Sequence, residues 1–278
     1  MAQANNTTTG GWGIAVSPPQ PPVVQLVGEI NHPDFGDAIE LLRSESRLIA
    51  SENTPPELIV VAQSRPDAIC GDQLKRLHRA APLAGIAALL GSWCEGETRT
   101  GRPWPGIQRL YWYEFRAWWR RQLQLRVANR CPDWARPATQ SHRQSEPGRP
   151  RPRSGLIVLR VPQRDNADAL ADVLNQAGHS TTWQRHDRAR AQTRGALAGI
   201  WDGGQLSDAE STDLAAFCAQ MSRDGAPVVV LLDFPRRDRV DRTYEVGAAA
   251  VLGKPYLNSD LIMTLEAIAA ASKRARAA

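Results

Sequence analysis

The sequence predicts an α/β protein with two domains, each built on a parallel sheet flanked by helices and joined by a linker rich in Arg and Pro. Short apolar segments alternate with amphipathic ones from residue 23 onward, a pattern typical of strands and crossover helices. The alternation stops over residues 126–154 and then restarts. The length of 278 residues also suits two domains of ordinary size.

Residues 23–125 are predicted to form the first domain. Leu58–Ala62 and Gly85–Leu90 are apolar at successive positions, which indicates strands with helices over both faces. The expected elements are strand VVQLVGEI, helix DAIELLRS, strands SRLIAS and ELIVVAQ, helix GDQLKRLHRAA and strand LAGIAALL. Residues 1–22 are polar, then Gly-rich, then Pro-rich, so they are predicted to be a disordered tail.

Residues 126–154 are predicted to be the linker, because the stretch from Arg130 to Ser154 holds five Pro, many Arg and Ser, and almost no aliphatic residue. The second domain then spans 155–272, followed by a basic tail at 273–278. Its expected elements are strand GLIVLRV, helix NADALADVLNQAG, strands HSTTW and GALAGIW, helix DAESTDLAAFCAQM, strand APVVVLLD and a helix over 260–271. Gly178 stands where the first of these helices needs a C-cap.

Composition and motifs exclude several classes of protein. No apolar run approaches the roughly 20 residues that span a bilayer, and the first residues do not form a secretory signal, so a cytoplasmic protein is expected. The four Cys lack the paired spacing of a disulfide framework or a zinc site. The sequence contains no P-loop, dinucleotide glycine fingerprint, nucleophile elbow or HExxH motif. No cofactor, metal or enzyme activity is therefore predicted.

The net charge of +5 is concentrated in one segment. Residues 116–153 hold ten Arg and two acidic residues, Asp133 and Glu146, so this segment carries +8 and the rest of the chain −3. Such a segment can contact several phosphates through counterion release, which depends steeply on salt. Weak nucleic-acid binding is therefore one candidate function, and no membrane partner is predicted.

The most specific stretch is RTYEVGAAAVLGKPYLNSD at residues 242–260. Gly247 and Ala248 end a helical segment, a strand follows, and the sequence Lys254-Pro255-Tyr256 closes it. This order resembles the end of a response-regulator receiver domain, and the resemblance extends over residues 155–272. It implies a flavodoxin-like, doubly wound parallel sheet and a role in phosphorelay signalling.

The resemblance also implies a pocket at the carboxyl ends of the strands. Asp202 stands where the family carries its phospho-accepting Asp, and Lys254 follows 52 residues later, close to the family's spacing. Asp233 ends the fourth strand and is a further candidate for the same pocket. From the residues alone, Asp202 is expected to be a carboxylate at a strand end that caps the turn at Gly203 and Gly204.

Three places depart from the family pattern. Arg160, Val161 and Pro162 stand where the family has an acidic pair that holds Mg²⁺. Leu232 replaces a hydroxyl residue, and Val251 replaces an aromatic residue. We therefore expect a degenerate, phosphorylation-independent receiver in which Arg160 approaches Asp202 and takes the electrostatic role of the metal. The vestigial pocket would consist of Asp202, Lys254, Arg160 and Asp233.

The first domain resembles the receiver class more faintly, since its third strand ends at Ala62-Gln63 without an Asp and no Lys-Pro step follows. Seven of its aromatic residues lie within residues 104–119, and some recur at four-residue spacing. This segment is predicted to be the last strand and helix that close the core. A partner-binding surface is the alternative, because Trp and Arg are enriched at binding hot spots. Its residues would be Trp112, Phe115, Arg116, Trp118, Trp119 and Arg120.

Together these observations favour a non-catalytic intracellular signalling adaptor with tandem pseudo-receiver domains, which acts by binding an unidentified protein partner. One alternative is a phosphorylatable receiver of a two-component phosphorelay, with Asp202 as the acceptor. The other is a weak nucleic-acid binder that uses the Arg-rich segment.

Overall fold

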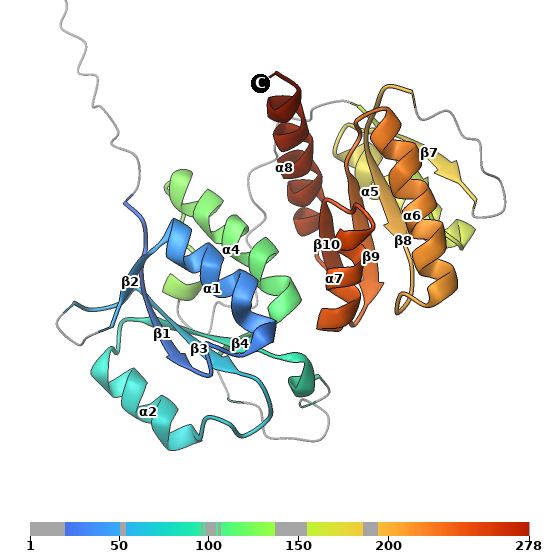
Figure 1. Cartoon of the computed structure of the whole chain (residues 1–278). Helices are drawn as coiled ribbons and strands as arrows, with labels where there is room; N and C mark the ends of the chain where they lie inside the picture. Colours follow the sequence, from blue (N-terminus) through green and yellow to red (C-terminus); the bar gives the residue numbers. More distant parts are fainter. Residues whose placement is uncertain are drawn as a thin grey trace, which may run out of the picture.

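The computed structural model of the chain describes residues 20–50, 54–95, 97, 104, 107–136, 155–185 and 194–277, with side chains up to residue 272. Figure 1 shows two α/β units, one formed by the first part of the chain and one by the last. We call them the first unit, up to residue 136, and the second unit, from residue 155. The predicted tail up to residue 19 and the linker residues 137–154 lie outside the described residues.

The first unit is a parallel five-stranded sheet with the strand order β2-β1-β3-β4-β5. All six residues of β3 are buried, as expected for a central strand with both faces covered. The elements are β1 (Val23–Gly28), α1 (Gly36–Glu45), β2 (Arg47–Ile49), β3 (Leu58–Gln63), α2 (Gly71–Ala80), β4 (Gly85–Leu90), β5 (Gln108–Tyr111) and α4 (Trp112–Val127), with 3-10 turns at Pro33–Phe35, Ser92–Cys94 and Asp133–Ala135.

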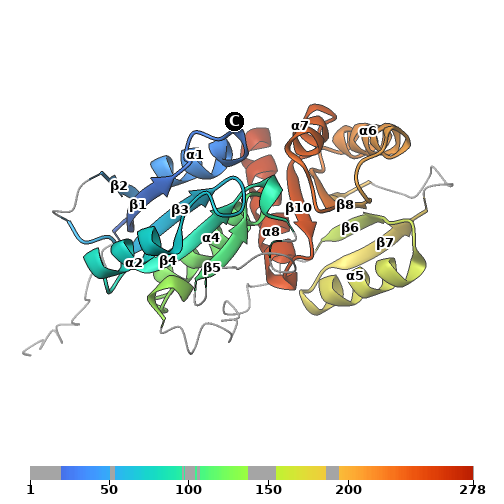
Figure 2. The same ribbon diagram turned by 90° about the horizontal axis from the view of Figure 1, so that it is seen from below.

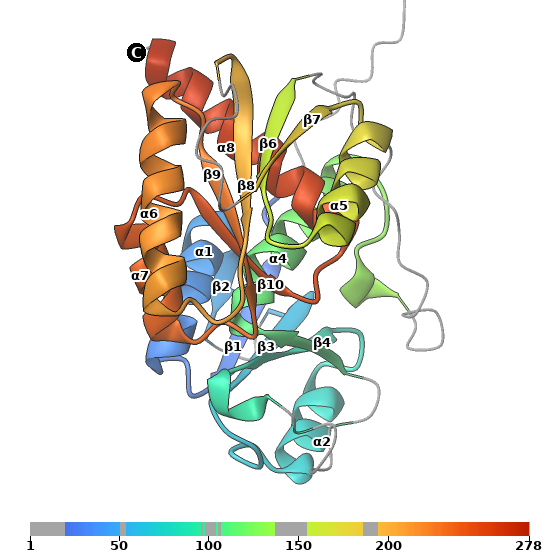
Figure 3. The same ribbon diagram turned by 90° about the vertical axis from the view of Figure 1, so that its right-hand side faces the viewer.

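The second unit is a parallel five-stranded sheet with the order β10-β9-β8-β6-β7. Figure 3 shows α5 and α6 on opposite sides of its strands. The elements are β6 (Leu156–Arg160), α5 (Arg164–Gln176), β7 (Ser180–Gln184), β8 (Ala196–Asp202), α6 (Asp208–Arg223), β9 (Val228–Asp233), α7 (Arg237–Glu245), β10 (Ala250–Lys254) and α8 (Asn258–Ala277).

Both units share one topology. Numbered within each unit, the strands run in the order 2-1-3-4-5, which is the flavodoxin-like order. In this order the second strand lies on one side of the first strand and the third strand lies on the other side. Ligands of such folds bind between the first and third strands, at the carboxyl edge of the sheet. The predicted fold class is therefore confirmed for both halves of the chain.

Local sequence signals explain several element ends. Gly178 follows α5 with a φ of +87°, a conformation that glycine adopts without steric cost. The backbone N–H of His179 then bonds to the carbonyl of Leu174 at 2.9 Å, which completes the expected C-cap. At the start of α6, Ser207 and Glu210 form a reciprocal capping box.

Two predicted boundaries are wrong. The predicted linker begins too early, because α4 continues to Val127 and Trp134 is buried against Trp118 and Trp119 of the first core. Gln122 fixes this return of the chain through reciprocal 2.7 Å hydrogen bonds with Asp133. At the other end, α8 runs to Ala277, so most of the predicted basic tail has a helical backbone.

The aromatic segment forms the interior of the first unit. Trp112, Phe115, Trp118 and Trp119 are at most 6% exposed and belong to one core cluster. The prediction of a last strand and helix that close the core is confirmed. The alternative of a partner surface is wrong for these four side chains, because a buried indole or phenyl ring cannot meet an outside partner. Arg116 is exposed and Arg120 half-buried.

Helix α4 also contacts the second unit. Its residue Ala117 belongs to a core cluster of the second unit, together with Leu252 of β10 and Leu261 of α8. Figure 2 shows β10 and α8 on the side of the second unit that faces the first. The Arg121 guanidinium donates to the Asp260 carboxylate at this contact, and both residues are buried. The two units are therefore joined through a packed interface as well as through the chain.

Candidate functional site at the carboxyl end of the second sheet

Three charged residues end three neighbouring strands. Asp202 is the last residue of β8, Asp233 of β9 and Lys254 of β10. Lys254 pairs in register with Asp233. Because parallel strands end at the same edge of a sheet, the fold brings these three side chains together, as the sequence predicted.

The Lys254 ammonium is held at the centre of this group. Its Nζ lies 2.8 Å from Oδ1 of Asp202, 2.9 Å from Oδ1 of Asp233 and 2.8 Å from the carbonyl oxygen of Gly203. An ammonium group has three N–H donors, so these contacts use all of them. The Asp202 side chain is 7% exposed and that of Asp233 is 47% exposed, so the first pair is the one shielded from water.

Burial alone would lower the pKa of Lys254, but the hydrogen bonds and negative charges of Asp202 and Asp233 outweigh burial and raise this pKa above its ordinary value. The side chain is therefore a cation at any physiological pH. A fixed positive charge between two carboxylates compensates the cost of burying Asp202.

The turn after β8 is organised by residues other than Asp202. The backbone N–H of Gly204 donates to Oε1 of Glu210 at 2.7 Å, and the N–H of Gly203 donates to the carbonyl of Leu231 at 3.1 Å. The expectation that Asp202 caps this turn is therefore wrong. A Cβ on Gly203 would lie 2.1 Å from the Trp201 ring, so the tight approach of the turn to the indole requires glycine here.

Arg160 does not approach Asp202, contrary to the prediction. Arg160 pairs in register with Trp201, and side chains along a strand alternate between the two faces of the sheet. Arg160 and Trp201 both bind Asp213 of α6: Nε of Arg160 lies 3.0 Å from Oδ2, and the Trp201 indole N–H donates to Oδ2 at 2.8 Å. Among the predicted pocket residues, Lys254 is the one cation that faces Asp202.

The residues present do not fit the Mg²⁺ site that the receiver resemblance implies. Mg²⁺ needs octahedral oxygen ligands, usually including one or two carboxylates. Arg160, the last residue of β6, is ion-paired with Asp213, and Val161, which follows it, is fully buried. Oδ1 of Asp202 is bound to the Lys254 ammonium. Among the described residues, no group of three or more His, Cys, Asp or Glu side chains is arranged for a metal ion.

Comparisons with known proteins give similarity at the level of the fold. No family model matches the chain, and no curated protein matches it. Among solved structures, the chain is similar to response-regulator receiver domains. NtrX from Brucella abortus is 23% identical with a TM-score of 0.38, and the match covers 44% of this chain and 29% of NtrX.

Two further matches are shorter proteins. The signal receiver domain of a histidine kinase from Syntrophus aciditrophicus is 20% identical, with a TM-score of 0.36, over 43% of this chain and 93% of that domain. A response regulator from Thermotoga maritima is 14% identical, with a TM-score of 0.36, over 42% of this chain and 98% of that protein. These matches add nothing about the chemistry of the site.

The corresponding edge of the first sheet has different residues. Gln63, at the end of β3, is buried and its Nε2 donates to Oε1 of Glu97 at 3.5 Å, while Glu97 forms an ion pair with Arg109 of β5. None of the sequence-predicted site residues lies there. Gly28 followed by Glu29 after the first strand was an available signal, because an acid directly after a strand-ending glycine lies at the ligand-binding edge of this fold.

Proposed function

We propose that this chain is a non-catalytic signalling adaptor of two-component type, with two receiver-like domains that act through protein contacts. The observation that supports the proposal is that the end of β6 carries Arg160, which is ion-paired with Asp213, and the buried Val161, where a metal site would need carboxylates. Asp202 has the Lys254 ammonium as its counter-ion instead.

Phosphoryl transfer to a carboxylate needs more than a counter-ion on the acceptor. A metal ion neutralises the phosphoryl oxygens, since otherwise the carboxylate and the phosphate repel each other. Leu232, the last residue but one of β9, stands where the family has a hydroxyl donor; it is fully buried and cannot hydrogen-bond to a phosphoryl oxygen. The site therefore suits a static ion pair better than a phosphorylation switch.

Contacts between the two units support the adaptor part of the proposal. Helix α4 packs against β10 and α8, and Arg237 of α7 binds Asp37 of α1 at 3.3 Å. The first unit thus packs against the face formed by α7, β10 and α8. A protein partner would bind the pair of units as one body through surfaces that remain exposed.

The test is phosphorylation by acetyl phosphate with Mg²⁺, followed by intact mass measurement. We expect no phosphoryl adduct on the wild-type chain, and the same result for Asp202→Asn. A functional receiver domain treated in parallel controls for the activity of the phosphodonor. A Mg²⁺-dependent adduct that disappears in Asp202→Asn would overturn the proposal.

That outcome would instead support the second candidate function, a phosphorylatable receiver. The observation in its favour is that Asp202 ends β8 only 2.8 Å from the Lys254 ammonium, which could neutralise one phosphoryl oxygen. The third candidate, weak nucleic-acid binding, stays a prediction. Within its Arg-rich segment, Arg121 and Arg126 are already ion-paired with Asp260 and Glu57.

A further inference from the structure

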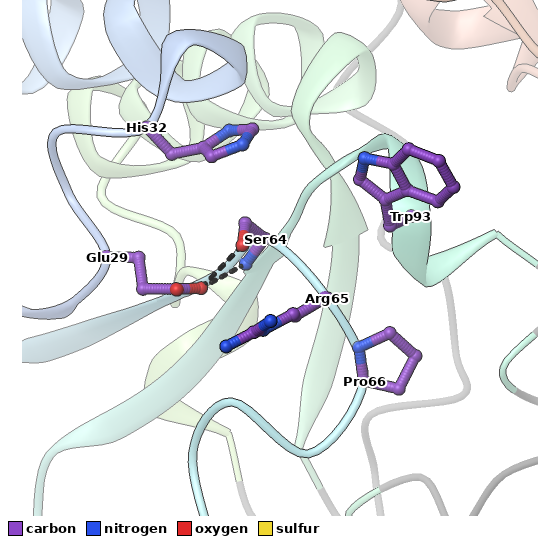
Figure 4. Close-up of a pocket in the computed structure, with 6 residues that line it drawn as sticks. All are labelled: Glu29, His32, Ser64, Arg65, Pro66 and Trp93. Carbon is purple, nitrogen blue, oxygen red and sulfur yellow. Dashed lines mark hydrogen bonds between the residues drawn. The ribbon is translucent and has the colours of Figure 1, made fainter.

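The carboxyl end of the first sheet has an open pocket of about 550 Å³, separate from the Lys254 site and called the cavity below. A volume of this size is within the usual range for small-molecule sites. The cavity lies beyond β1, β3 and β4, at the point between the first and third strands where ligands bind in this topology. Figure 4 shows the six residues that line it: Glu29, His32, Ser64, Arg65, Pro66 and Trp93.

The floor of the cavity is held by hydrogen bonds between the loops after β1 and β3. Gly28 has a φ of +93°, and a Cβ there would lie 2.3 Å from the carbonyl oxygen of Ala62, so only glycine allows this turn. The turn places the carboxylate of Glu29 over Ser64, whose N–H and hydroxyl donate to Oε2 at 2.9 and 2.6 Å. These two hydrogen bonds lower the pKa of Glu29, so it is an anion.

The loop after β4 is fixed to the same framework. The N–H of Ser92 donates to Oδ2 of Asp34 at 2.7 Å. A Cβ on Gly91 would lie 2.9 Å from that oxygen and from the Ser64 backbone, so glycine permits the close approach. Trp93, the next residue after Ser92, is left 77% exposed beside the cavity. An indole ring is thus presented to solvent from a rigid support.

Three side chains that line this cavity can make different contacts with a ligand. Trp93 offers a planar apolar face on which a flat ring can stack. Arg65 is an exposed guanidinium suited to phosphate oxygens. Nδ1 of His32 accepts from the N–H of Asp34 at 3.3 Å, so Nε2 carries the proton in the neutral ring and can donate to a ligand.

Glu29 restricts the ligand further. Its Oε2 is used by Ser64, and Oε1 remains able to accept a hydrogen bond. A simple anion would be repelled by this carboxylate, whereas a ligand with hydroxyl groups near its anionic group would donate to it. The ligand therefore needs a flat ring, hydroxyl donors and an anionic group.

We propose that this cavity binds a mononucleotide, with the base stacked on Trp93, a ribose hydroxyl donating to Glu29, and the phosphate bound by Arg65 and His32. This site is separate from the Lys254 group of the second sheet, because all the residues that line it belong to the first unit. Purine nucleotides should bind more tightly than pyrimidine nucleotides, since their larger rings stack over more of the indole.

Calorimetric titration of the full chain with AMP tests the proposal. We expect saturable binding, with adenosine and ribose 5-phosphate each about tenfold weaker or more, because each lacks one of the recognised groups. Equal affinity for ribose 5-phosphate and AMP would overturn the stacking role of Trp93. Binding of inorganic phosphate alone, or no saturable binding of AMP, would overturn the nucleotide proposal.

Variants locate the binding. Trp93→Ala and Arg65→Ala should each weaken AMP binding by about tenfold or more while the circular dichroism spectrum stays unchanged, because both side chains are exposed. Matched controls are Leu83→Ala, which removes a 97% exposed apolar side chain away from the cavity, and Arg76→Ala, which removes an exposed charge on α2. AMP binding that both cavity variants retain at full strength would place the ligand elsewhere and contradict the proposal.

Discussion

At the residue scale, the main feature of the second unit is that one ammonium group serves two carboxylates. Asp202 is buried and would be costly without a partner, and Lys254 gives it one within the sheet edge. The sequence predicted that Asp202, Lys254 and Asp233 come together, because each ends an apolar strand of a parallel sheet. It could not predict the partner of Arg160, since the face on which a side chain lies depends on the strand register, and Asp213 belongs to a helix distant in sequence.

Replacing Lys254 by Met should lower the free energy of unfolding by about 1–3 kcal/mol, because Asp202 then stays buried without its counter-ion. Urea unfolding measures this change. Lys75→Met is the matched control, since Lys75 is an exposed lysine on α2 and its loss should cost less than about 1 kcal/mol. Adding Asp202→Asn to Lys254→Met should recover part of the loss. A Lys254→Met variant as stable as wild type would show that the pair does not hold this site.

At the scale of single elements, α4 is buried on two sides, and the sequence revealed only one of them. The aromatic spacing predicted the face that packs into the first core. The second face consists of Ala117 and the charged residues Arg121 and Glu114, which look like a solvated surface in the sequence. Its partner is α8 of the other unit, and no local pattern encodes a contact between helices so far apart in the chain.

Gly253 tests this contact sterically. A Cβ at Gly253 would lie 2.4 Å from the Tyr113 ring of α4, so Gly253→Ala should push the two units apart and cost about 1–3 kcal/mol of stability. Thermal or urea unfolding measures the cost. Gly71→Ala is the matched control, because nothing lies within 4 Å of a Cβ at Gly71 and alanine favours the helix there. Equal stability of the two variants would contradict the packing of Tyr113 on β10.

Glu114 gives the same interface a pH dependence. Burial, with a smaller contribution from the charge of Asp260, raises the pKa of Glu114 to about 7, although the Tyr111 N–H and Arg121 act in the opposite direction. The folded chain therefore holds a proton that the unfolded chain releases near pH 4.5, so the contribution to stability is present at low pH and is lost as pH rises towards 7.

Glu114→Gln removes this titration and keeps an oxygen that can accept from Tyr111. The variant should match wild type near pH 4.5 and exceed it by up to about 3 kcal/mol at pH 8, as measured by urea unfolding at both values. Glu245→Gln, an exposed carboxylate on α7, should leave both curves close to wild type. A constant difference between Glu114→Gln and wild type across this range would rule out the titration of Glu114 as its cause.

At the scale of the whole molecule, alternating apolar and amphipathic segments predicted both sheets, and the sequence Lys254-Pro255-Tyr256 indicated the receiver-like fold of the second unit. The end of the first unit was harder to predict from the sequence. Trp134 is a single aromatic residue within a Pro- and Arg-rich stretch, and its burial depends on the three-dimensional position of α4. The described residues also contain no helix with the length and apolar character to cross a bilayer. The cavity residues of the first unit were missed because loops carry no periodicity.

Limited trypsin digestion should cut first within residues 137–154, where Arg and Pro predominate, and leave two resistant fragments. Because α4 packs on β10 and α8, these fragments should elute together in size-exclusion chromatography and separate only in denaturant. Mass spectrometry identifies the fragments. Fragments that elute separately without denaturant would contradict the interface, and early cleavage between β1 and β4 would contradict the first unit.

The position of β10 at the end of its sheet has a consequence for solubility. A strand in this position has an unpaired row of backbone N–H and C=O groups that can pair with a strand of another molecule and begin aggregation. Here α4 of the first unit lies beside β10, with Tyr113 against Gly253. We therefore expect the first unit to hinder intermolecular β-pairing of this strand. A chain that lost the first unit would expose β10 and become prone to forming β-linked oligomers.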